Sequence, residues 1–141
     1  MINPEEHFDY KKPTVQMLGR WQPWHDGHTK LFKKALTITG QVVIMVRDVF
    51  KYDGDAGAGR TAEQADNPFG MVQVVHDIEI GLREHGYKNG REYLIIEVPN
   101  IVDISYGRGV GYTFTEHDLG EDIHKISATA IRAQMREEGK L

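Results

Sequence analysis

Ten residues between an apolar run and a helical pattern constrain the fold of this chain more than any other stretch. The apolar run Thr14–Leu18 predicts a buried strand, and the helical pattern extends from about Gly27 to Thr39. The residues between them, Gly19–His28, read GRWQPWHDGH and therefore form the turn from the carboxyl end of a strand into the start of a helix. Open α/β sheets bind their ligands at this position.

The composition of this turn favours a phosphate group as the ligand. Backbone N–H groups at a helix start attract anions, and Gly19 and Gly27 let a ligand approach the backbone closely. Pro23 stiffens the loop, and His25 and His28 add ring N–H donors beside the helix end. These residues together predict a site for a phosphate that gains charge during a reaction. A metal site built on the two histidines is the alternative, which the lack of other ligand clusters and the intervening glycine disfavour.

Strand and helix patterns alternate along the rest of the chain. Strands are expected at Gln41–Val46, Tyr93–Val98 and Ile101–Ser105, and helices are expected to begin at Asn67 and Ser127. This alternation predicts an α/β fold with a Rossmann-like, open and mainly parallel sheet and with helices on both faces. Gln41–Val46 is apolar almost throughout and should be buried on both sides. We expect a single domain over residues 14–141, preceded by a polar N-terminal arm of residues 1–13.

The helix expected after Asn67 has a start signal and an apolar face. Asn67 is expected to be the N-cap and Pro68 the first helical residue. Apolar residues then recur at spacings of four, three and four, which places on one face Met71, Val75, Ile78 and Leu82. Gly86 is expected to end this helix.

The last helix has a start of a different kind. Ser127 is expected to be its N-cap, and Ile131 and Met135 share a face of the helix that Arg132 does not. Ser127, Thr129 and the first-turn N–H groups therefore form a second place that suits a phosphate.

Composition narrows the function classes. A chain of 141 residues with 40% hydrophobic residues can bury one core, and its net charge of -4 gives no general basic character for nucleic-acid binding. The absence of cysteine excludes disulfides and thiolate metal sites and fits a reducing compartment. No apolar run has the length of a membrane span, and residues 1–12 lack a signal-peptide core. A cytoplasmic protein without a membrane partner is the expectation.

Two motifs about a hundred residues apart resemble those of a known superfamily. Gly19–His28 resembles the GxFxPxHxGH signature of the HxGH nucleotidylyltransferases, with Trp21 in the aromatic position, and is especially similar to the GRFQPFHxGH form of archaeal-type nicotinamide-mononucleotide adenylyltransferases. Ile126–Arg132 is similar to the ISxTxIR motif of the same superfamily. Asn67–Phe69 resembles an NPF segment of the archaeal-type enzymes, so the resemblance spans roughly residues 14–136.

The resemblance implies an enzyme that transfers a nucleoside monophosphate from a nucleoside triphosphate to a small phosphorylated or phosphonate acceptor and releases pyrophosphate. It implies that His25 and His28 donate to the α-phosphate during in-line attack. Ser127, Thr129 and Arg132 would hold the other phosphates, with Arg132 on the leaving pyrophosphate and Mg²⁺ bound mainly through the nucleotide. A homo-oligomer is a further expectation from the resemblance. The remaining nucleotide-binding positions of the turn are Gly19, Arg20, Trp21 and Gly27.

Two loops supply further candidates. The loop after the second strand is rich in Gly, Ala and Asp and is expected to close over substrate, unless it is only a solvated connection. Its candidate contacts to acceptor or phosphate are Arg47, Lys51 and Arg60. The resemblance implies that the glycine-rich segment containing Gly107 and Arg108 helps to hold the base or ribose; a plain turn is the alternative.

The sequence leaves three alternatives open. The residues of Gly19–His28 and the Asn67–Phe69 segment favour ATP and an acceptor like nicotinamide mononucleotide. The short length of the chain is nearer to that of compact cytidylyltransferases and favours CTP slightly. Residues 120–125 do not show the RTEG of glycerol-phosphate-type cytidylyltransferases. A non-catalytic nucleotide-binding regulatory module is the alternative from a different class. One of Trp21 and Trp24 is expected in the core and the other against ligand.

Overall fold

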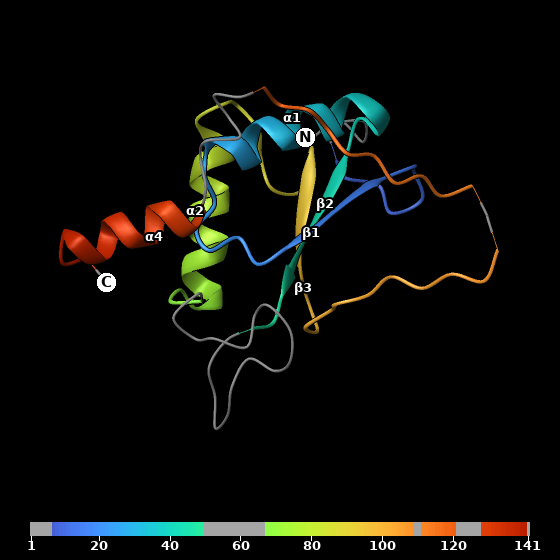
Figure 1. Ribbon diagram of the computed structural model, residues 1–141. Helices are drawn as coiled ribbons and strands as arrows, with labels where there is room; N and C mark the ends of the chain where they lie inside the picture. The colour runs from blue at the N-terminus through green and yellow to red at the C-terminus, as the bar shows by residue number, and fades with distance from the viewer. Residues whose placement is uncertain (1–6, 50–66, 109–110, 121–127, 141) are drawn as a thin grey trace.

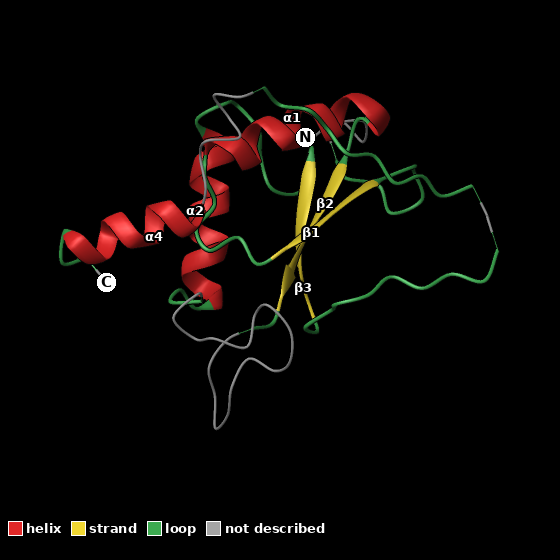
Figure 2. Cartoon of the chain, in the orientation of Figure 1, coloured by secondary structure: helices red, strands yellow, loops and turns green. Residues whose placement is uncertain are grey.

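The computed structural model describes residues 7–49, 67–108, 111–120 and 128–140, which form an open α/β structure (Figures 1 and 2). Strands and helices alternate along these residues as the sequence predicts. Their order is β1 (Val15–Gly19), α1 (Asp26–Thr39), β2 (Val42–Arg47), α2 (Met71–Arg83), β3 (Tyr93–Val98) and α4 (Ala128–Glu137). No helix among the described residues is long and apolar enough to cross a bilayer.

The described strands form one parallel sheet with β2 in the centre. Met17 of β1 lies opposite Ile44 of β2, and Ile44 lies opposite Ile95 of β3. Because all strands run the same way, their carboxyl ends meet at one edge, which is the edge that carries the loop after β1. Burial alternates along β2, so only one of its faces is completely covered. The expectation of burial on both faces was therefore wrong for half of this strand.

Helices α1 and α2 pack on the same face of the sheet. Phe32 of α1 and Ile78 of α2 share a buried cluster with Ile44 of β2, and the two helices contact each other. The chain crosses from β1 to β2 and then from β2 to β3 in the same direction across the sheet. Because such crossovers share one handedness, their helices lie on the same face. On the opposite face Gln16 and Ile96 are exposed. The predicted arrangement with helices on both faces is not what α1 and α2 adopt.

In the long loop after β3, the described residues 101–108 and 111–120 form no helix or strand, so the expected strand Ile101–Ser105 is absent. Residues 101–108 lead away from the end of β3, and residues 111–120 run back past α1, where Lys30 Nζ donates to the Leu119 carbonyl at 3.1 Å (Figure 1). Val102 is 73% exposed and Ile104 52%. An apolar run forms a strand only where it pairs with a neighbouring strand and packs on one face, and the exposed side chains of Val102 and Ile104 are not packed in this way.

The end of α1 is capped as the sequence predicts, whereas the start of α2 is not. Gly40 ends α1 in the left-handed conformation with φ 80°, as the sequence predicts. Helix α2 begins at Met71 with Gly70 as its N-cap, so the prediction that Asn67 caps it was wrong. The Asn67 side chain instead accepts a hydrogen bond from Arg20, which removes it from the helix start. The buried positions of α2 are Val74, Ile78 and Leu82, while Met71 and Val75 are half-buried.

Two phenylalanines provide a matched test of this fold. Phe32 is completely buried between α1 and the sheet, whereas Phe114 on the long loop is 66% exposed. We expect Phe32→Ala to lower the free energy of unfolding by about 3–5 kcal/mol because it leaves a cavity. Phe114→Ala should change it by less than about 0.5 kcal/mol. Urea unfolding of both variants measures this, and an equal loss for Phe114→Ala would mean that the loop is packed into a core.

Candidate functional site

Two histidines cap helix α1 by exchanging hydrogen bonds with its backbone. The Gly27 N–H donates to His25 Nδ1 at 3.0 Å, and the His25 N–H donates to His28 Nδ1 at 3.1 Å. This is a reciprocal capping box in which ring nitrogens replace the usual side-chain oxygens. A neutral imidazole whose Nδ1 accepts carries its proton on Nε2. Both rings therefore offer an Nε2–H donor at the helix start, where the helix dipole favours an anion.

Burial keeps these donors uncharged. The two rings stack with their centroids 3.6 Å apart, and the His28 ring also meets the Trp21 ring edge-on at 4.9 Å. Burial, and secondarily the neighbouring His25, lower the pKa of His28 to about 3. Burial also lowers the pKa of His25, against an opposing effect of the Asp26 carboxylate. At neutral pH His28 is thus a hydrogen-bond donor without a positive charge.

Both tryptophans of the turn belong to the core beneath the histidines. Each is 7% exposed, so the division into one core ring and one ligand-facing ring does not describe this structure. The Trp21 Nε1–H donates to the Met45 carbonyl at 3.1 Å, and the Trp24 Nε1–H donates to Thr29 Oγ1 at 2.8 Å. Both indoles therefore hold the turn against the core. Trp21 has a left-handed backbone conformation with φ 55°.

Two glycines make room for these rings. A Cβ on Gly19 would lie 2.9 Å from Cε2 of Trp21, and a Cβ on Gly81 would lie 2.9 Å from Cδ1 of Trp24. Gly81 was missed in the sequence, although a glycine inside a helical pattern is a signal of close packing. The role of Gly19 is therefore to admit Trp21, in addition to any approach of a ligand.

The turn before α2 is fixed to the same loop. Arg20 Nη1 donates to Asn67 Oδ1 at 3.1 Å. The Gln22 side chain donates through Nε2 to the Phe69 carbonyl at 2.9 Å and accepts the Phe69 N–H through Oε1, also at 2.9 Å. The two segments that the resemblance singles out, Gly19–His28 and Asn67–Phe69, therefore lie together. Gln22 was not singled out in the sequence, because nothing in its local pattern indicates a partner 47 residues away.

Helix α4 reaches the loop through Arg132. This side chain is 2% exposed; its Nη1 donates to the Gln22 carbonyl at 2.6 Å and its Nη2 donates to Thr129 Oγ1 at 3.3 Å. The start of α4 therefore lies against the loop after β1 (Figure 2). Two segments 110 residues apart, each expected to receive phosphate, are brought together. Ser127, the expected cap of this helix, lies outside the described residues.

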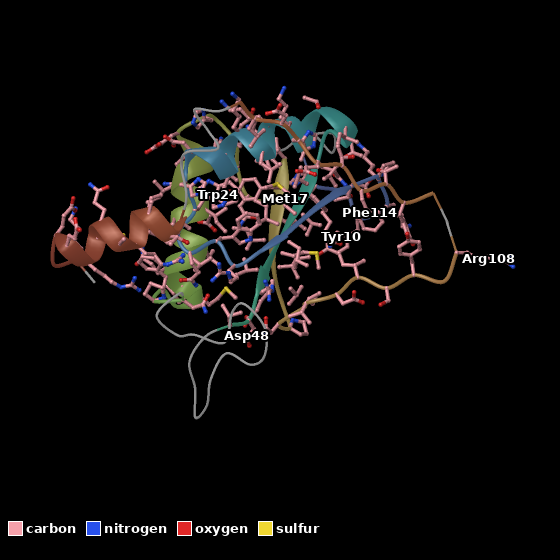
Figure 3. All side chains as sticks on the ribbon, in the orientation of Figure 1. Tyr10, Met17, Trp24, Asp48, Arg108 and Phe114 are labelled. Atoms are coloured by element: carbon pink, nitrogen blue, oxygen red, sulfur yellow. The ribbon has the colours of Figure 1, made fainter. Side chains whose placement is uncertain are left out.

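The remaining candidates are dispersed. Arg47 ends β2 at the carboxyl edge of the sheet and donates through Nη2 to Asn100 Oδ1 at 2.8 Å. Gly107 and Arg108 are exposed on the long loop, and Figure 3 shows Arg108 at its outer end, away from Trp24. The structure does not bring these two residues to the histidines. Lys51 and Arg60 lie outside the described residues.

The donor set of the site suits an anion. In the part of the chain that the structure describes, no three or more His, Cys, Asp and Glu side chains gather as a metal cage would require. Imidazole rings cap the start of α1, and the Arg132 guanidinium is bonded to the same loop at Gln22. Groups of these kinds can bind phosphate oxygens.

No family model and no curated protein matches this chain. The function is therefore argued from the residues of the site and their geometry.

The neutral state of His28 has a consequence for stability. The unfolded chain takes up a proton at the ordinary pKa of 6.5, while the folded chain resists it down to about 3. The unfolded state thus binds more protons in this window, so the free energy of unfolding should fall as the pH is lowered from 6.5 towards 3. We expect His28→Asn, which keeps an acceptor near the His25 N–H, to show a weaker pH dependence. Urea unfolding at a series of pH values measures both proteins, and parallel curves would contradict the burial of His28.

Proposed function

We propose that this protein is a nucleotidylyltransferase that transfers a nucleoside monophosphate from a nucleoside triphosphate to a small phosphorylated or phosphonate acceptor. The observation that carries the proposal is the reciprocal cap of α1, which directs two Nε2–H donors to a helix start. The open parallel sheet with this site after β1 supports the proposal. We infer that the sheet belongs to a Rossmann-like domain of the HxGH nucleotidylyltransferase superfamily.

In the proposed reaction the acceptor oxygen attacks the α-phosphorus in line. A new P–O bond forms, the bond from the α-phosphorus to the bridging oxygen breaks, and pyrophosphate leaves with the electron pair. Negative charge grows on the phosphoryl and bridging oxygens, and His25 and His28 would donate to them from Nε2. Donors that are already oriented need no reorganisation as charge develops, which is the main source of their catalytic effect. No covalent enzyme intermediate is required.

Arg132 and Thr129 would hold the pyrophosphate end of the nucleotide. The bond from Arg132 Nη1 to the Gln22 carbonyl is short at 2.6 Å, whereas the contact from Nη2 to Thr129 Oγ1 is long at 3.3 Å. We propose that a phosphate oxygen replaces the weaker of the two contacts while the stronger one keeps the guanidinium in place. A guanidinium can bind two oxygens of a phosphate at once.

The residues of the site fit Mg²⁺ that enters with the nucleotide. The described residues contain no carboxylate cage for it, so the phosphates and water would supply most of its ligands. When bound, Mg²⁺ would offset part of the charge of the triphosphate.

The proposal includes two candidate reactions, which differ in the base of the nucleotide and in the acceptor. Transfer of CMP is the first candidate. Transfer of AMP to an acceptor like nicotinamide mononucleotide is the second candidate. It is favoured by one observation: Asn67 and Phe69, which belong to the segment that resembles the adenylyltransferases, are hydrogen-bonded to the loop after β1.

A panel of nucleotides distinguishes the two candidates. Thermal unfolding is measured with ATP, CTP, GTP or UTP in the presence of Mg²⁺. A ligand at 100 times its dissociation constant stabilises the native state by about 2.7 kcal/mol, which shifts the melting temperature clearly. We expect the largest shift with CTP; a shift with ATP alone selects the adenylyltransferase. No shift with any nucleotide at millimolar concentration would refute the transferase.

Removal of one histidine donor tests the chemistry. We expect His28→Asn to lower kcat by about 100- to 1000-fold while nucleotide binding persists, because the donor acts mainly in the transition state. His85→Ala is the matched control, since His85 is exposed beyond the end of α2. Pyrophosphate release measures turnover. A non-catalytic nucleotide-binding module would bind nucleotide equally well in all three proteins and would release no pyrophosphate in any of them.

A further inference from the structure

Gln22 is a buried polar residue in the centre of the site. It is 2% exposed and lies between Trp21 and the cis peptide bond to Pro23. Its side-chain amide forms a two-bond clamp on the Phe69 backbone, with Nε2 donating to the carbonyl and Oε1 accepting the N–H, both at 2.9 Å. Both ends of the amide are thus committed to one residue of the turn before α2.

The main chain of the same residue supports Arg132. The Gln22 carbonyl accepts the 2.6 Å hydrogen bond from Nη1, which ties α4 to the loop after β1. Within the described part of α4, Arg132 is the residue that is buried. The position of this guanidinium therefore depends on where the Gln22 peptide lies, and the Phe69 clamp holds that peptide.

We propose that Gln22 is a positioning residue that acts through Arg132. Its side chain fixes the loop to Phe69, and its carbonyl then fixes the guanidinium at the pyrophosphate end of the site. This inference rests on the proposed function only for the identity of the anion that Arg132 binds. The chain of contacts from Phe69 through Gln22 to Arg132 exists in the free protein.

Gln41 offers a matched control. It is also buried, and its side-chain Nε2 donates to the Asp9 carbonyl and to Thr14 Oγ1, both at 2.7 Å, while its Oε1 accepts the Asp9 N–H. Gln41 precedes β2 and so lies at the amino edge of the sheet, opposite to the edge that carries the site. Gln22 and Gln41 thus make the same kind of clamp, but of the two only Gln22 accepts a hydrogen bond from Arg132.

The test compares Gln22→Glu with Gln41→Glu. Each change keeps the shape of the side chain and removes the N–H donor, so a carboxylate faces a backbone carbonyl. We expect hydrogen exchange of the backbone amides of α4 in the free protein to become faster in Gln22→Glu and to remain unchanged in Gln41→Glu. Unchanged exchange in α4 for Gln22→Glu, or equal acceleration in both variants, would overturn the proposal.

A second measurement uses inorganic pyrophosphate with Mg²⁺ as the probe in isothermal titration calorimetry. We expect Gln22→Glu to weaken pyrophosphate binding about 10- to 100-fold, because a displaced guanidinium loses a charge-assisted hydrogen bond to the anion. Arg132→Lys should weaken it similarly, and the double variant should lose little more than either single variant because both act through one group. Additive losses would overturn the proposal.

The two proposals fail in different ways. If the wild-type protein binds neither pyrophosphate nor any nucleoside triphosphate, the proposed function is refuted, and the exchange of α4 still decides whether Gln22 positions Arg132. If the wild-type protein binds pyrophosphate but Gln22→Glu binds it equally well, the positioning role is refuted and the proposed function stands.

Discussion

The site depends on the need of helix α1 to satisfy the N–H groups at its start. His25 and His28 meet that need with their Nδ1 atoms, so the same hydrogen bonds that cap the helix set the tautomer of each ring. A serine, threonine or carboxylate cap would use its oxygen on the backbone and keep no N–H for a ligand. A histidine cap keeps a second nitrogen, and here it carries the proton. Stability of the helix and orientation of the donors therefore come from one interaction.

The aromatic packing beneath the cap determines its charge. Trp21 and Trp24 lie against His28, and their ring N–H groups are bonded to Met45 and Thr29, so they bring little water with them. Desolvation and the positive end of the helix dipole both oppose protonation of an imidazole. An uncharged donor of this kind can strengthen its hydrogen bond as charge builds up on a phosphate, without holding the substrate as an ion pair would.

Contacts between distant segments complete the site. The loop after β1 is bonded to the turn before α2 through Gln22 and to α4 through Arg132. The buried guanidinium of Arg132 gives α4 a fixed starting point, although the helix contributes little to the main core. Polar groups this deeply buried are costly unless they are bonded, so the loop, the turn and the helix constrain one another.

The sequence by itself determined the alternation of strands and helices, the bounds of β3, the end of α1 at Gly40 and the position of the two-histidine turn between β1 and α1. Those features follow from side-chain periodicity and capping within a few residues of the chain. Tertiary structure decided that Asn67 bonds Arg20 instead of capping α2, that both tryptophans are buried, and that Ile101–Ser105 is not a strand. It also decided that Arg132 meets Gln22. Each of these outcomes depends on partners far away in the chain, because burial and hydrogen bonding of a polar or apolar group are set by what the fold places beside it.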